Sequence, residues 1–237
     1  MNSTDPIGNA ILDYHAKQHN TDIIVSSNLM EDDVIPIDYL FRGFTSFPKL
    51  EKLAIKNCVG HVLDIGAAAG PHAKHLASQG YEVTTVEVSQ GAHTYLKETL
   101  PQAHHYLSPI LNFNHGKYDT ILLLMNGIGI AGTLVQITPF LRHLSGLLTP
   151  NGKILCESTD VKYFYEDDEG GTWFDLNAQY YGEFKFNMHY KEIESGWFDW
   201  IYLDAENFKK CAKDAGLDHK IIGKDEPSFL MELKKLV

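Results

Sequence analysis

The sequence contains few cysteines and none of the paired cysteine motifs that hold zinc or build disulfide frameworks. Its three cysteines, Cys58, Cys156 and Cys211, are odd in number and far apart among 237 residues, so neither kind of crosslink is expected. Histidines are more frequent, but a helically spaced pair such as His72 and His75 lacks the Glu or Cys partner that would complete a set of metal ligands. We therefore expect no metal site.

Positive charge is also scarce. Lys and Arg total 20 residues against 31 Asp and Glu, which gives a formal net charge of −11, and no run of basic residues interrupts this pattern. A phosphate backbone or an anionic membrane surface would be repelled by most of such a surface. The composition therefore argues against nucleic acid and membranes as partners, and a small molecule is the expected one.

Long hydrophobic runs are absent as well. The longest candidate, Thr120 to Met125, has the length of a strand and falls far short of a membrane span. The opening residues combine neither a basic start nor an apolar core, so they do not resemble a signal peptide. These absences predict a cytoplasmic globular protein.

From Gly60 onward the sequence alternates between strand, turn and helix patterns. Five apolar strands separated by helical segments are expected at residues 61–65, 81–88, 104–107, 119–125 and 153–158. The continuous apolar run of the fourth strand is typical of a strand covered on both faces in a parallel sheet. Short strands with helical crossovers predict an α/β fold with a doubly wound, mostly parallel sheet.

The remainder of the chain departs from this rhythm. Strand-like segments at 183–192 and 197–204 flank a short turn and predict an inserted β-hairpin. A helix at 205–215 that ends at Gly216 and two final strands around Pro227 follow, which brings the main sheet to seven strands. We expect one domain over residues 1–237, composed of an N-terminal helical lid (1–46), a ligand-binding core (47–160), the insertion (161–204) and a C-terminal helix with the final strands (205–237).

The most informative segment, at residues 62–70, reads VLDIGAAAG. It combines a short strand with a turn in which Gly66 and Gly70 let the backbone approach a ligand beside a helix N-terminus. A dinucleotide fingerprint that starts at Gly66 would need glycines where this chain has Ala68 and Pro71. The alternative interpretation, a tight turn that binds nothing, is less favoured because further motifs follow in order.

Asp64 stands just before this turn, where a carboxylate suits a cationic ligand better than a diphosphate. The segment resembles motif I of the class I S-adenosylmethionine-dependent methyltransferases, with Ala68 in place of the usual middle glycine. In that family an acid at the end of the next strand holds the two ribose hydroxyls, and Glu87 has this position. The segments DYLFR, VEVS, YDTILLLMNGIGI and LLTPNGKIL extend the resemblance to a group of small bacterial methyltransferases of mostly unassigned substrate.

The resemblance implies a Rossmann-like fold with S-adenosylmethionine as the methyl donor. His72 lies close enough to the glycine turn to meet the methionine end of the donor, and Arg42 in the lid is placed to pair with its carboxylate. Ser108 or a backbone carbonyl would replace the Asp that the family often places near adenine. The full predicted donor-binding set is Asp64, Gly66, Ala67, Gly70, His72, Glu87, Val88, Ser108, Pro109, Ile110, Met125 and Arg42.

The methyl acceptor is less clearly encoded. Asn126 follows the fourth strand at the edge where ligands bind to such sheets, and its amide either orients an acceptor or satisfies the adjoining turn. The insertion holds all three tryptophans, many other aromatics and an acidic run at Glu166–Glu169. Packing of the hairpin accounts for most of these rings. The surplus predicts a pocket for an apolar, aromatic or amine-bearing small molecule, with Tyr181 as a candidate wall residue.

Methyl transfer from a sulfonium requires mainly alignment of the acceptor and exclusion of water, so the lack of an obvious catalytic set is consistent with this activity. Two other functions are compatible with the sequence. One is a non-catalytic module that binds S-adenosylmethionine or S-adenosylhomocysteine. The other, which Ala68 and Pro71 disfavour, is a nicotinamide-dependent oxidoreductase. We therefore expect a methyltransferase.

Overall fold

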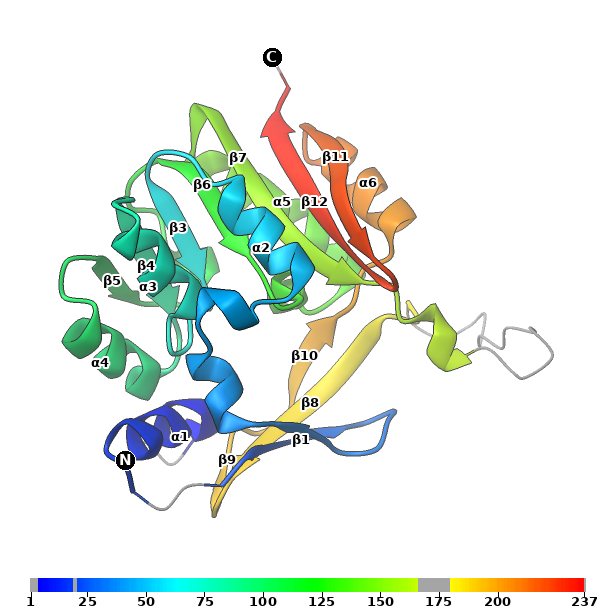
Figure 1. Ribbon diagram of the computed structural model, residues 1–237. Coiled ribbons are helices and arrows are strands. Elements are labelled where there is room, and N and C mark those ends of the chain that lie inside the picture. Colours follow the sequence, from blue (N-terminus) through cyan, green and yellow to red (C-terminus); the bar gives the residue numbers. More distant parts are fainter. Residues whose placement is uncertain (1–3, 19–20, 166–179, 237) are drawn as a thin grey trace.

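The computed structural model describes residues 4–18, 21–165 and 180–236. These residues form a seven-stranded sheet covered by helices and a smaller sheet below it (Figure 1). The acidic run Glu166–Glu169 and Trp173, singled out in the sequence, lie outside the described residues. Within the described ranges, no helix combines the length and the apolar character needed to cross a membrane.

The large sheet confirms the predicted seven-stranded, mostly parallel architecture. Its strands, in spatial order, are β11 (Leu217–Asp225), β12 (Ser228–Lys235), β7 (Leu148–Thr159), β6 (Tyr118–Leu123), β3 (Val62–Ile65), β4 (Val83–Glu87) and β5 (His104–Leu107). Strand β12 is antiparallel to both of its neighbours, and the strands from β7 to β5 are parallel. From β3 the chain adds β4 and β5 on one side and then crosses back to add β6 and β7 on the other side. This reversal of strand order is where a crevice opens at the carboxyl ends of β3 and β6.

Helices cover both faces of this sheet. They are α2 (Lys49–Lys56), α3 (Pro71–Ser78), α4 (Gln90–Thr99), α5 (Leu134–Leu147) and α6 (Ala205–Asp214). The apolar run of β6 is divided between two cores: Leu122 packs with α2 and α3, whereas Ile121 and Leu123 pack with α5 and α6. Each such buried side chain contributes about 1.5–3 kcal/mol of transfer free energy. The prediction of a strand buried on both faces is confirmed.

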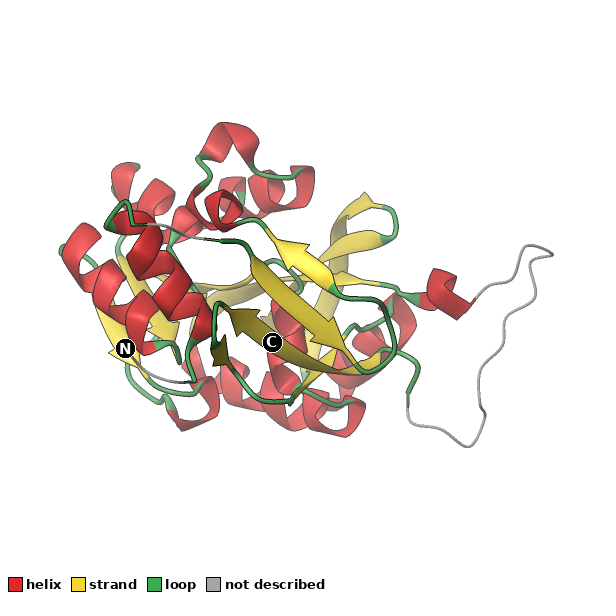
Figure 2. Cartoon of the chain, turned by 90° about the horizontal axis from the view of Figure 1, so that it is seen from below, coloured by secondary structure: helices red, strands yellow, loops and turns green. Residues whose placement is uncertain are grey.

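The second sheet is built from two distant parts of the chain. Its strands, in spatial order, are β10 (Phe198–Ile201), β8 (Glu183–Tyr190), β1 (Ile23–Ser27) and β2 (Asp33–Ile35), with the short β9 (Ile193–Glu194) also paired to β8. All of these pairings are antiparallel. The predicted hairpin is present between β8 and β10, but β8 also pairs with the N-terminal β1. Figure 2 views the molecule from below, the side on which this sheet lies.

The segment expected to form a helical lid is therefore only partly helical. It contains one α-helix, α1 (Pro6–His15), in addition to β1 and β2. Ile23 and Val25 of β1 are buried, whereas Ile24 between them is 44% exposed, the alternation of a strand with one covered face. The described residues also form five short 3-10 helices: η1 (Ile37–Phe41), η2 (Phe44–Ser46), η3 (Ile110–Asn112), η4 (Gly127–Ala131) and η5 (Lys162–Tyr165).

Helix α1 packs on α4 at very short range. A Cβ atom added to Gly91 of α4 would lie 2.5 Å from the backbone of Gly8 in α1, so the two helices approach through their glycines. At its other end α1 is attached to the second sheet, where the Asp13 carboxylate accepts hydrogen bonds from the Tyr190 hydroxyl at 3.0 Å and the Lys191 ammonium at 2.6 Å. Helix α1 thus joins the large sheet to the small one.

Candidate functional site

The turn between β3 and α3 brings backbone N–H groups to the edge of the large sheet. Gly66 and Gly70 have φ angles of 69° and 71°, and Ala68 between them has a φ of 48°. This left-handed region is open to glycine and costs an alanine about 1–2 kcal/mol. The turn is closed by the N–H of Gly70, which donates to the carbonyl of Ala67 at 2.7 Å. The N–H of Ala68 then faces the end of β4.

Glu87 ends β4 and receives three backbone hydrogen bonds. Its Oε2 accepts from the N–H of Ala68 at 2.8 Å, and its Oε1 accepts from the N–H groups of Val88 at 2.8 Å and Ser89 at 3.0 Å. Burial raises the pKa of this carboxyl group above its usual range, and the three N–H donors oppose that shift. A carboxylate offers about four acceptor positions, so this one can accept further hydroxyl groups from a ligand.

Other predicted donor residues lie around Glu87. Val88 follows Glu87 directly, and its apolar side chain is 68% exposed. The N–H of Ser108 donates to the Glu87 carbonyl at 3.0 Å, and the Ser108 hydroxyl donates to the carbonyl of Pro109. Ile110 is placed differently, because its side chain is 5% exposed and packs in the core beside α5. Ser108 therefore stands beside Glu87 while Ile110 is part of the hydrophobic core.

A buried cluster of charges lies next to the glycine turn. The Arg42 guanidinium donates to both Glu51 oxygens, at 2.6 and 2.7 Å, and His72 Nε2 lies 2.6 Å from Glu51 Oε2. Burial alone would raise the pKa of Glu51, but the hydrogen bond and charge of His72, together with Arg42, hold it below its usual value. Arg42 and His72, both predicted to face the donor, are therefore engaged with a carboxylate of α2.

Two atoms near this cluster lack a hydrogen-bond partner within the described chain. They are Asp64 Oδ2 and Arg42 Nε, and both are buried. Burial raises the pKa of Asp64 to about 6, while the charge of His72 lowers it and that of Glu87 raises it. A buried polar atom without a partner costs about 1–3 kcal/mol. Asp64 Oδ2 is an open acceptor, which suits the ammonium group of an amino acid, and Arg42 Nε is an open donor, which suits its carboxylate. The two residues therefore fit the methionine end of the predicted methyl donor.

Met125 and Asn126 form a constrained turn at the end of β6. Both have left-handed backbones, with φ angles of 55° and 57°. Strand β7 holds them in place: Glu157 Oε2 accepts from the N–H of Met125 at 3.0 Å, and the Thr159 hydroxyl donates to Asn126 Oδ1 at 2.8 Å. Such backbone conformations cost of order 1–3 kcal/mol each and persist where the surroundings fix them.

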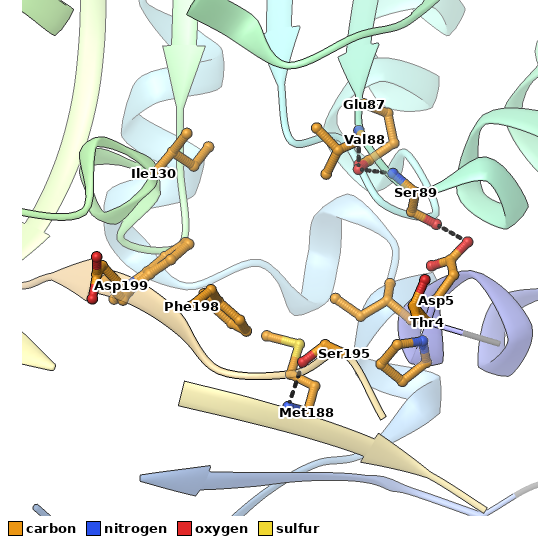
Figure 3. Close-up of a pocket in the computed structure, with 13 residues that line it drawn as sticks. Thr4, Asp5, Glu87, Val88, Ser89, Ile130, Met188, Ser195, Phe198 and Asp199 are labelled. Carbon is orange, nitrogen blue, oxygen red and sulfur yellow. Dashed lines mark hydrogen bonds between the residues drawn. The ribbon is translucent and has the colours of Figure 1, made fainter. Parts of the chain in front are cut away.

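Two neighbouring cavities open beside these residues. The larger, of about 510 Å³, lies between the N-terminus of α1, the end of β4 and the second sheet, and Glu87 and Val88 line it (Figure 3). The smaller, of about 170 Å³, is lined by Met125 and Asn126 together with β1, β2, β8 and β10. Among the described residues, three line both cavities: Met188, Phe198 and Trp200.

The structure brings some predicted residues to the cavities and places others apart. Glu87 and Val88 line the larger cavity, and Met125 and Asn126 line the smaller one. A Cβ added to Gly66 would lie 3.4 Å from the side chain of Ile130, a residue of the larger cavity. Tyr181 is not among the described residues that line either cavity, and its hydroxyl donates to Asp160 at 2.8 Å. That Tyr181 forms a wall of the acceptor pocket stays a prediction.

Several residues of the cavities were missed by the sequence analysis. Thr4, Asp5, Pro6 and Ile7 lie in the N-terminal segment and line the larger cavity. Their sequence carries no motif beyond an Asp-Pro pair typical of a helix start. The aromatic richness of the insertion did indicate a wall, but it did not distinguish the rings that line a cavity from those that pack the sheet.

Comparison with known proteins agrees with this geometry. Residues 41–219 match a family described as a methyltransferase domain, three quarters of the chain. A crystal structure of an S-adenosylmethionine-dependent methyltransferase from Bacteroides fragilis in complex with S-adenosylhomocysteine superposes with a TM-score of 0.92 at 33% identity, covering 99% of this chain and 96% of that one.

Two further similarities are more distant. The sugar N-methyltransferase KedS8 from a Streptoalloteichus species has a TM-score of 0.58 at 14% identity, over 89% of this chain and 98% of that chain, which shows a shared fold alone. A ubiquinone biosynthesis O-methyltransferase from Rickettsia felis is 29% identical over 124 residues, which are 50% of this chain and 46% of that protein. The chain thus aligns with about half the length of this curated relative.

The family match over three quarters of the chain and the Bacteroides fragilis structure together show the family. The chain belongs to the class I S-adenosylmethionine-dependent methyltransferases, whose methyl donor is S-adenosylmethionine.

Proposed function

We propose that this protein transfers a methyl group from S-adenosylmethionine to a small organic acceptor, with the donor in the larger cavity and the acceptor in the smaller one. The observation that carries this proposal is the shared wall. Because Met188, Phe198 and Trp200 line both cavities, ligands bound in the two would be neighbours at the edge of the large sheet. A methyl group can pass directly only between groups in such contact.

The larger cavity supports the donor assignment. Glu87 is placed to accept the two ribose hydroxyls, and the exposed Val88 beside it offers an apolar surface to the adenine. Asp64 and Arg42 do not line this cavity, but each has a buried open atom of the kind that the ammonium and carboxylate groups of the amino-acid end require. When bound, the donor supplies a methyl group already activated by its sulfonium charge. The protein is then left to hold both reactants in line and to keep water out.

The second sheet and Asn126 support the acceptor assignment. Strands β8 and β10 contribute apolar side chains to the wall of the cavity that Met125 and Asn126 line. Since Asn126 Oδ1 accepts a hydrogen bond from Thr159, the amide is fixed in one orientation with its NH2 group available as a donor. We assign Asn126 the role of orienting the acceptor. The two named relatives methylate oxygen in one case and nitrogen in the other, so their names do not select the acceptor atom.

The proposal is tested by separating donor binding from turnover. Calorimetry should show binding of S-adenosylhomocysteine at micromolar affinity or better, worth roughly 8 kcal/mol. The protein with S-adenosylmethionine and a small-molecule extract should then form S-adenosylhomocysteine and a methylated product that mass spectrometry identifies. Donor binding without turnover on any extract would instead support the non-catalytic module. A lack of donor binding would contradict the assignment of the larger cavity.

A further inference from the structure

The smaller cavity is walled largely by aromatic and methionine side chains of the second sheet. Phe186, Phe198, Trp200 and Tyr202 line it, together with Met30, Met125 and Met188. Its volume of about 170 Å³ corresponds to about six water-sized groups. The space therefore fits the reacting end of an acceptor, a group of a few heavy atoms.

The rings of this wall face one another at steep angles. Phe198 and Trp200 meet at 79° with centroids 6.3 Å apart, and Phe186 and Tyr202 meet at 90° with centroids 6.3 Å apart. Each pair is in edge-to-face contact, and all four rings line the cavity, so its contents meet an aromatic wall. The negative face of an aromatic ring attracts a cation, and such cages are used to bind substituted ammonium groups. Burial raises the pKa of Tyr202 to about 12, so its ring remains a neutral phenol.

The charges around both cavities have one sign. Glu31 and Asp33 line the smaller cavity and are exposed, so they lie where it opens to solvent. Asp5, Glu87 and Asp199 line the larger one. None of the described residues that line either cavity is Lys, Arg or His. A carboxylate or phosphate group on the acceptor would therefore meet only like charge, whereas a cation would be attracted by both the rings and the acids.

We propose that the smaller cavity binds the amino group of the acceptor and that this protein is an N-methyltransferase. The inference rests on the proposed function, because it assumes that the acceptor occupies this cavity. The acceptor enters as an ammonium ion against the aromatic wall that includes Phe198 and Trp200, and it gives one proton to solvent water. The freed nitrogen lone pair forms the new N–C bond as the C–S bond of the donor breaks and its electron pair passes to sulfur. The products are a methylated ammonium ion and a neutral thioether.

Three probes of similar shape and different charge test this inference on the protein saturated with S-adenosylhomocysteine. They are tetramethylammonium, tert-butanol and pivalate, and their binding is followed by the fluorescence of the tryptophans and by NMR line broadening. We expect tetramethylammonium to bind at least about tenfold more tightly than tert-butanol and pivalate not to bind. Equal affinity for tert-butanol, binding of pivalate, or no binding of tetramethylammonium would overturn the inference.

Matched variants identify the source of the selectivity. Phe198→Leu keeps apolar volume and removes an aromatic face, so it should reduce the preference for the cation severalfold without reducing the affinity for tert-butanol. The double variant Glu31→Gln and Asp33→Asn should reduce the preference as well. The control is Glu192→Gln, which removes an exposed carboxylate in the turn between β8 and β9. Glu192 lines neither cavity, so this variant should keep the preference. An unchanged preference in both test variants would contradict the cage.

Binding of S-adenosylhomocysteine distinguishes a failure of the proposed function from a failure of the inference about nitrogen. If the protein binds it and methylates a neutral alcohol in preference to amines, the proposed function stands and the inference about nitrogen is wrong. If S-adenosylhomocysteine does not bind, the donor assignment fails and the inference fails with it.

Discussion

Asp5 and Ser89, 84 residues apart in the chain, are joined by a hydrogen bond of 3.0 Å between the Ser89 hydroxyl and Asp5 Oδ2. Each residue also caps a helix: Asp5 Oδ1 accepts from the N–H of Gly8 in α1, and Ser89 Oγ accepts from the N–H of Ala92 in α4. Because the N–H of Ser89 donates to Glu87, the bond links the N-terminal segment to the carboxylate assigned to the donor ribose. Figure 3 shows Asp5, Ser89 and Glu87 together at the larger cavity.

Asp5→Asn should weaken donor binding about tenfold, which corresponds to about 1.4 kcal/mol. An amide offers one acceptor atom to donors that now share two carboxylate oxygens, so the Ser89 loop would lose part of its support. The control is Asp13→Asn, which removes the charge that holds the other end of α1 to Tyr190 and Lys191. Both variants should lower the free energy of unfolding by about 1–3 kcal/mol. Similar losses of donor affinity in the two, measured by calorimetry, would show that Asp5 acts only through helix stability.

Glu87→Ala should weaken binding of S-adenosylhomocysteine by about 1.5–3 kcal/mol, because it removes a charged acceptor from two hydroxyl groups. The fold should persist, since the three N–H groups that now donate to Glu87 are beside a cavity that water can enter. Calorimetry gives the affinity, and circular dichroism confirms the fold. Normal affinity in this variant would show that Glu87 is not the ribose ligand.

Donor affinity should fall as the pH drops through about 6. Burial raises the pKa of Asp64 from 3.8 to about 6, so the folded protein binds a proton there more tightly than the unfolded chain does. In the absence of donor, stability should therefore decrease as the pH rises from about 4 to about 6. The donor ammonium favours the ionised carboxylate, so its binding should show the opposite trend. Asp64→Asn should bind weakly with a flatter pH profile in calorimetry, and an unchanged profile would exclude Asp64 as the titrating group.

Gly129→Ala should reduce turnover by at least about tenfold, because a Cβ at this position would lie 2.0 Å from Trp200 Cε2 and push the indole into the cavities. The matched control is Gly146→Ala, where a Cβ would meet nothing within 4 Å. Gly146 lies in α5, so that variant should gain about 0.5–1 kcal/mol of stability and keep normal turnover. Normal turnover in Gly129→Ala would show that the position of Trp200 is not critical.

Features encoded within short segments could be predicted from the sequence. The strand from Val62 to Ile65 with its glycine turn, Glu87 at the end of the next strand and the doubly buried β6 all follow from local pattern and spacing. The pairing of β1 with β8 could not be predicted, because neither strand specifies a partner so far away in the chain. The surroundings of Arg42 were missed for a related reason. Glu51 stands in an amphipathic helix among charged residues, so nothing in the sequence marks it as a buried partner.

The pairing of β1 with β8 also affects how the protein is made. During synthesis on the ribosome, β1 and β2 emerge early, and β8 follows only after the whole parallel part of the large sheet. Until then the edge of β1 that pairs with β8 offers free N–H and C=O groups to other chains. The nascent protein therefore passes through a stage that chaperones would recognise. In that stage the glycine turn and Glu87 have been synthesised, whereas the aromatic wall has not.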